Sequence, residues 1–150
     1  MSQTHTNLNY HIIFGTKDRR PTLLPEFRDD LCRYLGGIVK NSDGHPLEIN
    51  AVEDHAHMLV RLPPTVALAN VIRAVKAGSS KWLNETRANK SKFAWQDGYA
   101  AFSVSQSHLP QVAEYVRNQA EHHRRKSFRE ELVAFLKRNA IAYDERYLPD

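Results

Sequence analysis

The sequence has 150 residues, of which 41% are hydrophobic and 25% charged, a balance that is typical of one globular domain and argues against a disordered protein. Its 21 Lys and Arg residues against 17 Asp and Glu give a formal net charge of +4, which permits a polyanionic partner but does not require one. The single cysteine, Cys32, excludes an internal disulfide framework, and no apolar run approaches the roughly 18 residues that span a bilayer. Because the first segment is also unlike a signal peptide, we expect one soluble, cytoplasmic domain over residues 1–150.

Hydrophobic periodicity and turn residues predict an alternation of strands and helices. In chain order, the expected elements are a strand at residues 7–14, a helix at 25–39, strands at 47–53 and 55–62, a helix at 66–84, a strand within 98–107, and helices that begin at Pro110 and at Ser127. This is the split βαβ order of a ferredoxin-like fold. We therefore expect an α+β domain, with an antiparallel sheet, helices on one face and additional C-terminal helices. The fold alone indicates no function.

The most informative motif is the pair His55 and His57 in the predicted strand 55–62. Residues i and i+2 of a strand project from the same face, so both imidazoles can reach one metal ion. Asp54 precedes the pair and is a candidate to orient one of the ligands from behind. Two unrelated surface histidines would give the same pattern, so the motif alone leaves both interpretations open.

A second candidate group lies on the predicted helix after Pro110. Tyr115, Gln119 and His122 are spaced so that a helix brings them within roughly 60° of one another. An amide oxygen is a plausible ligand for a hard divalent ion beside imidazoles. A phenol is able to attack phosphorus in covalent catalysis. The sequence identifies no base for it: His122 lies on the right face to support it, but a histidine that solvates the helix or contacts DNA fits equally. The spacing equally fits a tyrosine packed between helix and sheet with its hydroxyl in water.

Together, these residues resemble the single-tyrosine transposases of the HUH superfamily. More narrowly, the chain is similar to the small insertion-sequence transposases that move as single-stranded DNA, with REP-associated tyrosine transposases as near relatives. The resemblance covers nearly the whole chain, in the blocks NYHIIFGTKDRRPTL, DHAHMLVRLPP, WQDGYAAFSVS, YVRNQAEHHRRKSF and IAYDERYL. The five blocks in this order are far more specific than any one of them.

The resemblance implies a transposase that cleaves and rejoins single-stranded DNA at hairpin-marked element ends. His55, His57 and Gln119 would bind a divalent metal, Mg²⁺ in the cell with Mn²⁺ as a substitute in vitro. Tyr115 would attack the scissile phosphate, leaving a 5′-phosphotyrosine and a free 3′-hydroxyl. The family also implies a homodimer whose active sites combine the histidine pair of one chain with the tyrosine helix of the other.

Basic residues along the chain are candidates for phosphate contacts that position DNA without reading its sequence. They are Lys17, Arg19, Arg20, Arg73, Lys76, Lys81, Arg124, Arg125 and Lys126. Aromatic residues near them are candidates for stacking on unpaired bases, namely Trp82, Phe93, Trp95 and Tyr99. Alternatively, the charges solvate exposed faces and Trp82 belongs to the core.

Three other functions fit parts of the sequence. A domesticated REP-associated tyrosine transposase would share the chemistry and differ in its biological role. A non-catalytic module that binds single-stranded nucleic acid would use the basic and aromatic residues but would not need the histidine pair with Tyr115. A phosphoesterase that uses water as nucleophile would need the histidines and would not form a covalent adduct.

Overall fold

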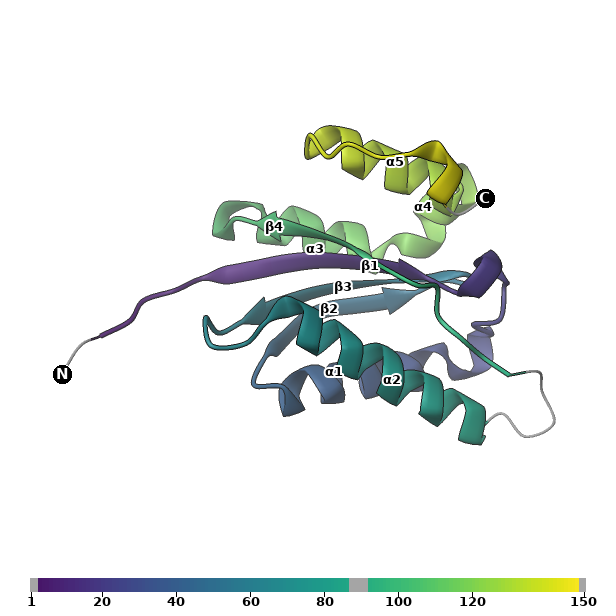
Figure 1. Ribbon diagram of the computed structural model, residues 1–150, viewed down its shortest axis with the longest axis horizontal. Coiled ribbons are helices and arrows are strands. Elements are labelled where there is room, and N and C mark those ends of the chain that lie inside the picture. The colour runs from purple at the N-terminus through teal and green to yellow at the C-terminus, as the bar shows by residue number, and fades with distance from the viewer. Residues whose placement is uncertain (1–2, 87–91, 149–150) are drawn as a thin grey trace.

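A four-stranded antiparallel sheet forms the centre of the protein, in the order β2-β3-β1-β4. The computed structural model describes residues 3–86 and 92–148 (Figure 1). The strands are β1 (Leu8–Gly15), β2 (His45–Ala51), β3 (His55–Leu62) and β4 (Ala100–Val104). The predicted α+β class, with its antiparallel sheet, is confirmed.

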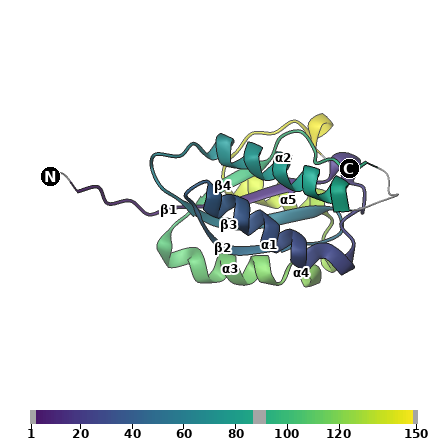
Figure 2. The ribbon, with the colours of Figure 1, turned by 90° about the horizontal axis from the view of Figure 1, so that it is seen from below.

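Helices cover both faces of this sheet (Figures 1 and 2). On one face lie the helices between the strands, α1 (Pro25–Asn41) and α2 (Leu68–Thr86). On the other lie the C-terminal helices, α3 (Leu109–Arg117), α4 (Gln119–Arg125) and α5 (Phe128–Arg138). Among the described residues, no helix combines the length and apolar character needed to cross a membrane.

Strand β3 is buried on both faces because it lies between the two helical layers. Its residues Ala56, Met58 and Val60 join the main core beneath α1 and α2, as their alternation predicts. The opposite face, with His55 and His57, is covered by the C-terminal helices and is also buried. A polar pair inside a covered sheet face needs partners, because unpaired buried polar groups are costly.

The start of α5 is fixed by a capping box. The Ser127 side chain accepts a hydrogen bond from the backbone N–H of Glu130, and the Glu130 side chain accepts one from the backbone N–H of Ser127. Helical spacing then turns Phe128, Glu131 and Leu132 toward the sheet, where all three are buried. The cap therefore sets which residues of α5 reach the histidine face.

The helix predicted after Pro110 is divided into α3 and α4 at Asn118. Asn118 has φ −96° and ψ 25°, outside the α-helical region. The side chain of Asn50 on β2 donates to the carbonyls of Val116 and Arg117, at 3.0 and 2.9 Å. These bonds satisfy carbonyls at the end of α3 and give a physical reason for the break.

We expect Gly15→Ala to lower the free energy of unfolding by about 1–3 kcal/mol, because overpacking strains a close contact. An added Cβ would overlap the Phe128 ring and lie 2.6 Å from Oε1 of Gln96. Urea unfolding measures the effect. The matched control is Gly37→Ala in α1, where nothing lies within 4 Å of the added Cβ and the higher helix propensity of alanine stabilises by up to about 1 kcal/mol. Equal stability of Gly15→Ala and the wild type would contradict the prediction.

Candidate functional site

The two histidines of β3 lie side by side beneath the C-terminal helices. His55 is opposite Gly15 and His57 is opposite Ile13 in the pairing with β1. The absence of a side chain at Gly15 leaves room for Phe128, whose ring stacks on His55 at a centroid distance of 4.4 Å. This packing holds the His55 ring, and the two imidazole centroids are 5.1 Å apart.

A carboxylate that was not predicted, Glu131 on α5, joins the two histidines. Its Oε1 lies 3.1 Å from Nε2 of His55 and 2.9 Å from Nε2 of His57. Its Oε2 accepts hydrogen bonds from the hydroxyl of Tyr115 and from Nε2 of Gln119. Burial alone would raise the pKa of Glu131, but its hydrogen bonds to the histidines hold that pKa well below its usual range.

Tyr115, Gln119 and His122 all lie at this site, and each has different contacts. Gln119 is buried, with its Oε1 3.3 Å from Nε2 of His55. Burial, and then the negative charge of Glu131, raise the pKa of the Tyr115 hydroxyl above its usual value. The His122 ring stacks on the Tyr115 ring at 4.3 Å, so it contacts the face of the phenol.

Asp54 lies behind His55, where it was predicted to orient a ligand. Its Oδ1 is 2.7 Å from Nδ1 of His55. The same carboxylate is 3.8 Å from Nε of Arg19 and 3.7 Å from Nε2 of His123. With its Nδ1 bonded to a carboxylate, His55 directs Nε2 toward Glu131 and Gln119.

A second residue that was not predicted, His11 on β1, supports His57. Its Nε2 lies 2.7 Å from Nδ1 of His57, and both rings are buried. Burial, and then the neighbouring His57, lower the pKa of His11 to about 3. His11 is therefore neutral at physiological pH.

The donor set fits a divalent cation. Ligand atoms of His55, His57 and Glu131 all lie within 4.8 Å of one another, and the amide oxygen of Gln119 is adjacent. Two imidazole nitrogens with carboxylate and amide oxygens suit Mg²⁺ or Mn²⁺ and also admit other transition ions. Ligand atoms of Asp54, His55 and His123 also lie within 4.8 Å of one another, but the Asp54 carboxylate already faces Arg19.

Residues 4–119 match the protein family described as "Transposase IS200 like". The chain belongs to this family. It is therefore a DNA transposition protein of a family whose activity is DNA cleavage and joining. The matched segment includes His55, His57, Tyr115 and Gln119 and ends before Glu131.

Known relatives of this IS200-like transposase have similar lengths. The transposase for insertion sequence element IS200 of Salmonella typhimurium is 26% identical over 126 residues, covering 81% of this chain and 82% of the relative. The ISDra2 transposase TnpA of Deinococcus radiodurans is 26% identical over 117 residues, covering 75% and 84%.

Two solved structures share the fold. A structure described as a transposase from Deinococcus radiodurans matches with a TM-score of 0.63 and 24% identity, over 79% of this chain and 98% of the other. A REP-associated tyrosine transposase, whose structure holds a bound REP hairpin, matches with a TM-score of 0.60 and 13% identity, over 82% and 74%. At these identities the two likenesses show the fold alone.

We expect the transposase to bind Mn²⁺ more tightly as the pH rises toward 8, by about tenfold per pH unit. Burial lowers the pKa of His55, but hydrogen bonds to Asp54 and Glu131 outweigh it and raise that pKa to about 8. Below this pH, a proton on the imidazole competes with the metal. Calorimetric titrations between pH 6 and pH 9 measure the change. In Asp54→Asn, which loses the carboxylate that helps to raise the His55 pKa, the Mn²⁺ affinity should stop rising at a lower pH. A pH-independent affinity would contradict the prediction.

The basic residues proposed to contact DNA are distributed over both faces of the fold, on the loop after β1, on α2 and on α4. Lys17, Arg20, Arg73, Lys81, Arg124, Arg125 and Lys126 are exposed. Arg124 and Arg125 pair with Glu121. The Lys76 amine instead donates to the backbone carbonyls of Gln96 and Gly98, so it braces the segment before β4.

The four aromatic residues that were candidates for stacking on DNA bases differ in their exposure. Phe93 and Trp95 are only 2% and 7% exposed, so the prediction that they stack on DNA bases is wrong. Trp95 donates from its indole nitrogen to Ser79 at 2.9 Å, because a buried indole needs an acceptor. Trp82 stacks on Tyr34 and packs against the core. Tyr99 remains exposed.

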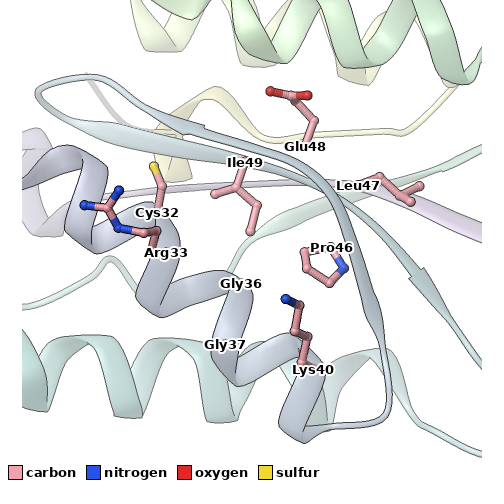
Figure 3. A pocket seen from close by; sticks show the side chains of 9 residues that line it. All are labelled: Cys32, Arg33, Gly36, Gly37, Lys40, Pro46, Leu47, Glu48 and Ile49. Atoms are coloured by element: carbon pink, nitrogen blue, oxygen red, sulfur yellow. The ribbon is translucent and has the colours of Figure 1, made fainter.

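A separate hollow of about 520 Å³ lies between α1 and β2 (Figure 3). Gly36 and Gly37 leave it open above Pro46 and Ile49. Its lining residues are Cys32, Arg33, Gly36, Gly37, Lys40, Pro46, Leu47, Glu48 and Ile49. None of the residues around the His55 and His57 pair lines it, so we assign it no part in the chemistry.

Proposed function

We propose that this IS200-like transposase cleaves and rejoins single-stranded DNA through a covalent bond to Tyr115, with a divalent cation at the histidine pair. The observation that carries this proposal is the meeting of the Tyr115 hydroxyl and both imidazoles on one buried carboxylate, Glu131. A nucleophile beside a set of metal ligands is the arrangement that metal-assisted phosphodiester transfer to tyrosine needs.

His55 and His57 would hold the cation through Nε2, with Gln119 and Glu131 as oxygen donors. When bound, the cation neutralises negative charge on the scissile phosphate. Mg²⁺ is the expected ion in the cell, and Mn²⁺ also suits two imidazoles. Asp54 keeps the His55 ring in place from the opposite nitrogen.

Transfer to Tyr115 conserves the phosphodiester bond energy. The tyrosine oxygen bonds to phosphorus, and its hydroxyl proton, which is hydrogen-bonded to Oε2 of Glu131 in the resting chain, is released to solvent as that bond forms. The bond from phosphorus to the 3′ oxygen breaks, and that oxygen takes up one proton from solvent, which balances the proton released by Tyr115. The 5′ phosphate stays on the tyrosine until the 3′-hydroxyl of a second strand attacks it. The tyrosine oxygen then leaves phosphorus and takes up the proton that the 3′-hydroxyl loses, which rejoins DNA without ATP.

The proposed substrate is single-stranded DNA with a hairpin. This is supported by the structural relative that holds a REP hairpin and by the exposed basic residues around the fold. A domesticated role like that of the REP-associated enzymes would use the same substrate class and chemistry. It would differ in which genomic hairpin is recognised.

The test is to incubate the chain with Mg²⁺ or Mn²⁺ and labelled single-stranded DNA carrying hairpins from the flanks of its own gene. A covalent band on a denaturing gel is expected, with DNA mapped to Tyr115 by mass spectrometry. EDTA and His57→Ala should abolish the band. Cleavage without an adduct would instead indicate a phosphoesterase that uses water, and binding with neither would indicate a non-catalytic module.

We expect no recovery of activity when inactive His57→Ala and Tyr115→Phe chains are mixed. The Tyr115 ring lies 5.9 Å from the His57 ring of its own chain, which supports an active site built from one chain. The measurement is adduct formation after confirmed subunit exchange. Recovery would establish the alternative implied by the family resemblance, a homodimer whose sites combine residues of both chains.

A further inference from the structure

His57 is bonded at both ends of its imidazole ring. One nitrogen, Nε2, lies 2.9 Å from Oε1 of Glu131 at the proposed metal site. The other, Nδ1, lies 2.7 Å from Nε2 of His11. Because His57 is 0% exposed, these two partners determine which of its ring nitrogens carries the proton.

The sheet register brings the two histidines together diagonally. His57 is opposite Ile13, and His11 is opposite Leu59, two residues further along the pair of strands. Diagonal neighbours on one sheet face lie within reach of ring side chains. The ring centroids are 5.0 Å apart, and His11 is further held between Phe102 and Phe135.

A neutral imidazole carries one N–H, so a cation bound at Nε2 requires the proton to be on Nδ1. That proton then points at His11, and only a lone pair there can receive it. We propose that His11 is a positioning residue, whose Nε2 accepts the Nδ1 proton of His57 and leaves Nε2 of His57 free for a divalent cation. This inference rests on the proposed function, since it takes His57 as a metal ligand.

The two proposed ligands therefore have different kinds of hydrogen-bond partner at Nδ1. His55 has the carboxylate of Asp54 at Nδ1, which can only accept a hydrogen bond. His57 has an imidazole, which can either accept or donate. In the absence of a cation, His57 can donate from Nε2 to Glu131 while His11 donates to its Nδ1. Binding a cation would reverse the direction of the hydrogen bond between His11 and His57, so that His57 donates from Nδ1. One proton leaves Nε2 of His57, and one is taken up at Nδ1 of His11.

Two substitutions separate the hydrogen bond from the packing. In His11→Gln, the amide oxygen can replace the accepting nitrogen. In His11→Phe, a ring of similar shape has no acceptor. His11 lines a cavity of about 390 Å³ with Phe102, Phe135 and Arg138, which leaves room for the larger ring.

The experiment measures Mn²⁺ binding by calorimetry in the wild type and both variants. Loss of a partner behind a metal ligand weakens binding by about 10–100-fold, and we expect this in His11→Phe. His11→Gln should remain within about threefold of the wild type, since it keeps the acceptor. ¹⁵N NMR of the Mg²⁺-loaded wild type should find the His57 proton on Nδ1, and it provides a test even where a variant fails to fold.

Equal Mn²⁺ affinity of folded His11→Phe and the wild type would overturn the inference, as would equal weakening in both variants. A proton on Nε2 of His57 in the Mg²⁺-loaded protein would also overturn it. Failure of the proposed function has a different signature, because Mn²⁺ affinity would then be unchanged by His57→Ala. In that case His57 is not a ligand, and the assignment to His11 fails with it.

Discussion

Replacing Tyr115 with phenylalanine is expected to lower covalent adduct formation and DNA joining by at least about 10⁴-fold, the scale on which loss of a nucleophile acts. The phenol supplies the oxygen that would bond to phosphorus, and within residues 3–86 and 92–148 no other side-chain hydroxyl contacts Glu131. Rates of adduct formation on a hairpin-containing strand measure the effect.

The same Tyr115→Phe variant should still bind Mn²⁺ within about threefold of the wild type, because the histidine pair and Glu131 are retained. Tyr147→Phe is the matched control, since that tyrosine is 82% exposed and should leave the rate unchanged. Unaltered cleavage in Tyr115→Phe would rule out the tyrosine mechanism. Simultaneous loss of Mn²⁺ affinity would mean that the hydroxyl supports the metal site.

The order of elements was predictable from the sequence because local signals set it. Strand β3 begins and ends at the predicted residues, His55 and Leu62, since Asp54 and Pro63 bound a run of clear alternation. The placement of the C-terminal helices was not predictable in the same way. Periodicity shows that α5 has an apolar side, but it does not show which face of the sheet that side covers.

The residues of the proposed site fall into the same two groups, those placed by local spacing and those placed by contacts between distant segments. His55 and His57 share a face because of the strand period, and Tyr115 and Gln119 remain about one turn apart although the helix breaks at Asn118. Glu131 and His11 depend on contacts between residues far apart in the chain, 74 and 46 positions from His57. No local pattern links such pairs. The capping box at Ser127 was a usable signal for the inward face of α5, but it could not indicate what that face would meet.

Replacing Glu131 with glutamine is expected to weaken Mn²⁺ binding by at least about 100-fold and to destabilise the folded protein. The carboxylate is the charged partner of both proposed ligand histidines. Breaking a buried ion pair by removing one partner costs about 3–5 kcal/mol, and glutamine, which keeps the shape, should cost about 3 kcal/mol. Calorimetric titration and urea unfolding measure the two effects.

The loss of stability in Glu131→Gln should depend on pH in a defined direction. The pKa of His55 is raised to about 8 in the folded chain, so its charged form stabilises the fold below its unfolded value of about 6.5. This stabilisation is lost as the pH rises through 8. The difference between wild type and variant should therefore be larger at pH 6 than at pH 9. Glu114→Gln, on the exposed side of α3, should show neither effect. An equal loss at both pH values would mean that Glu131 acts through packing and neutral hydrogen bonds, and that its charge does not support the histidine pair.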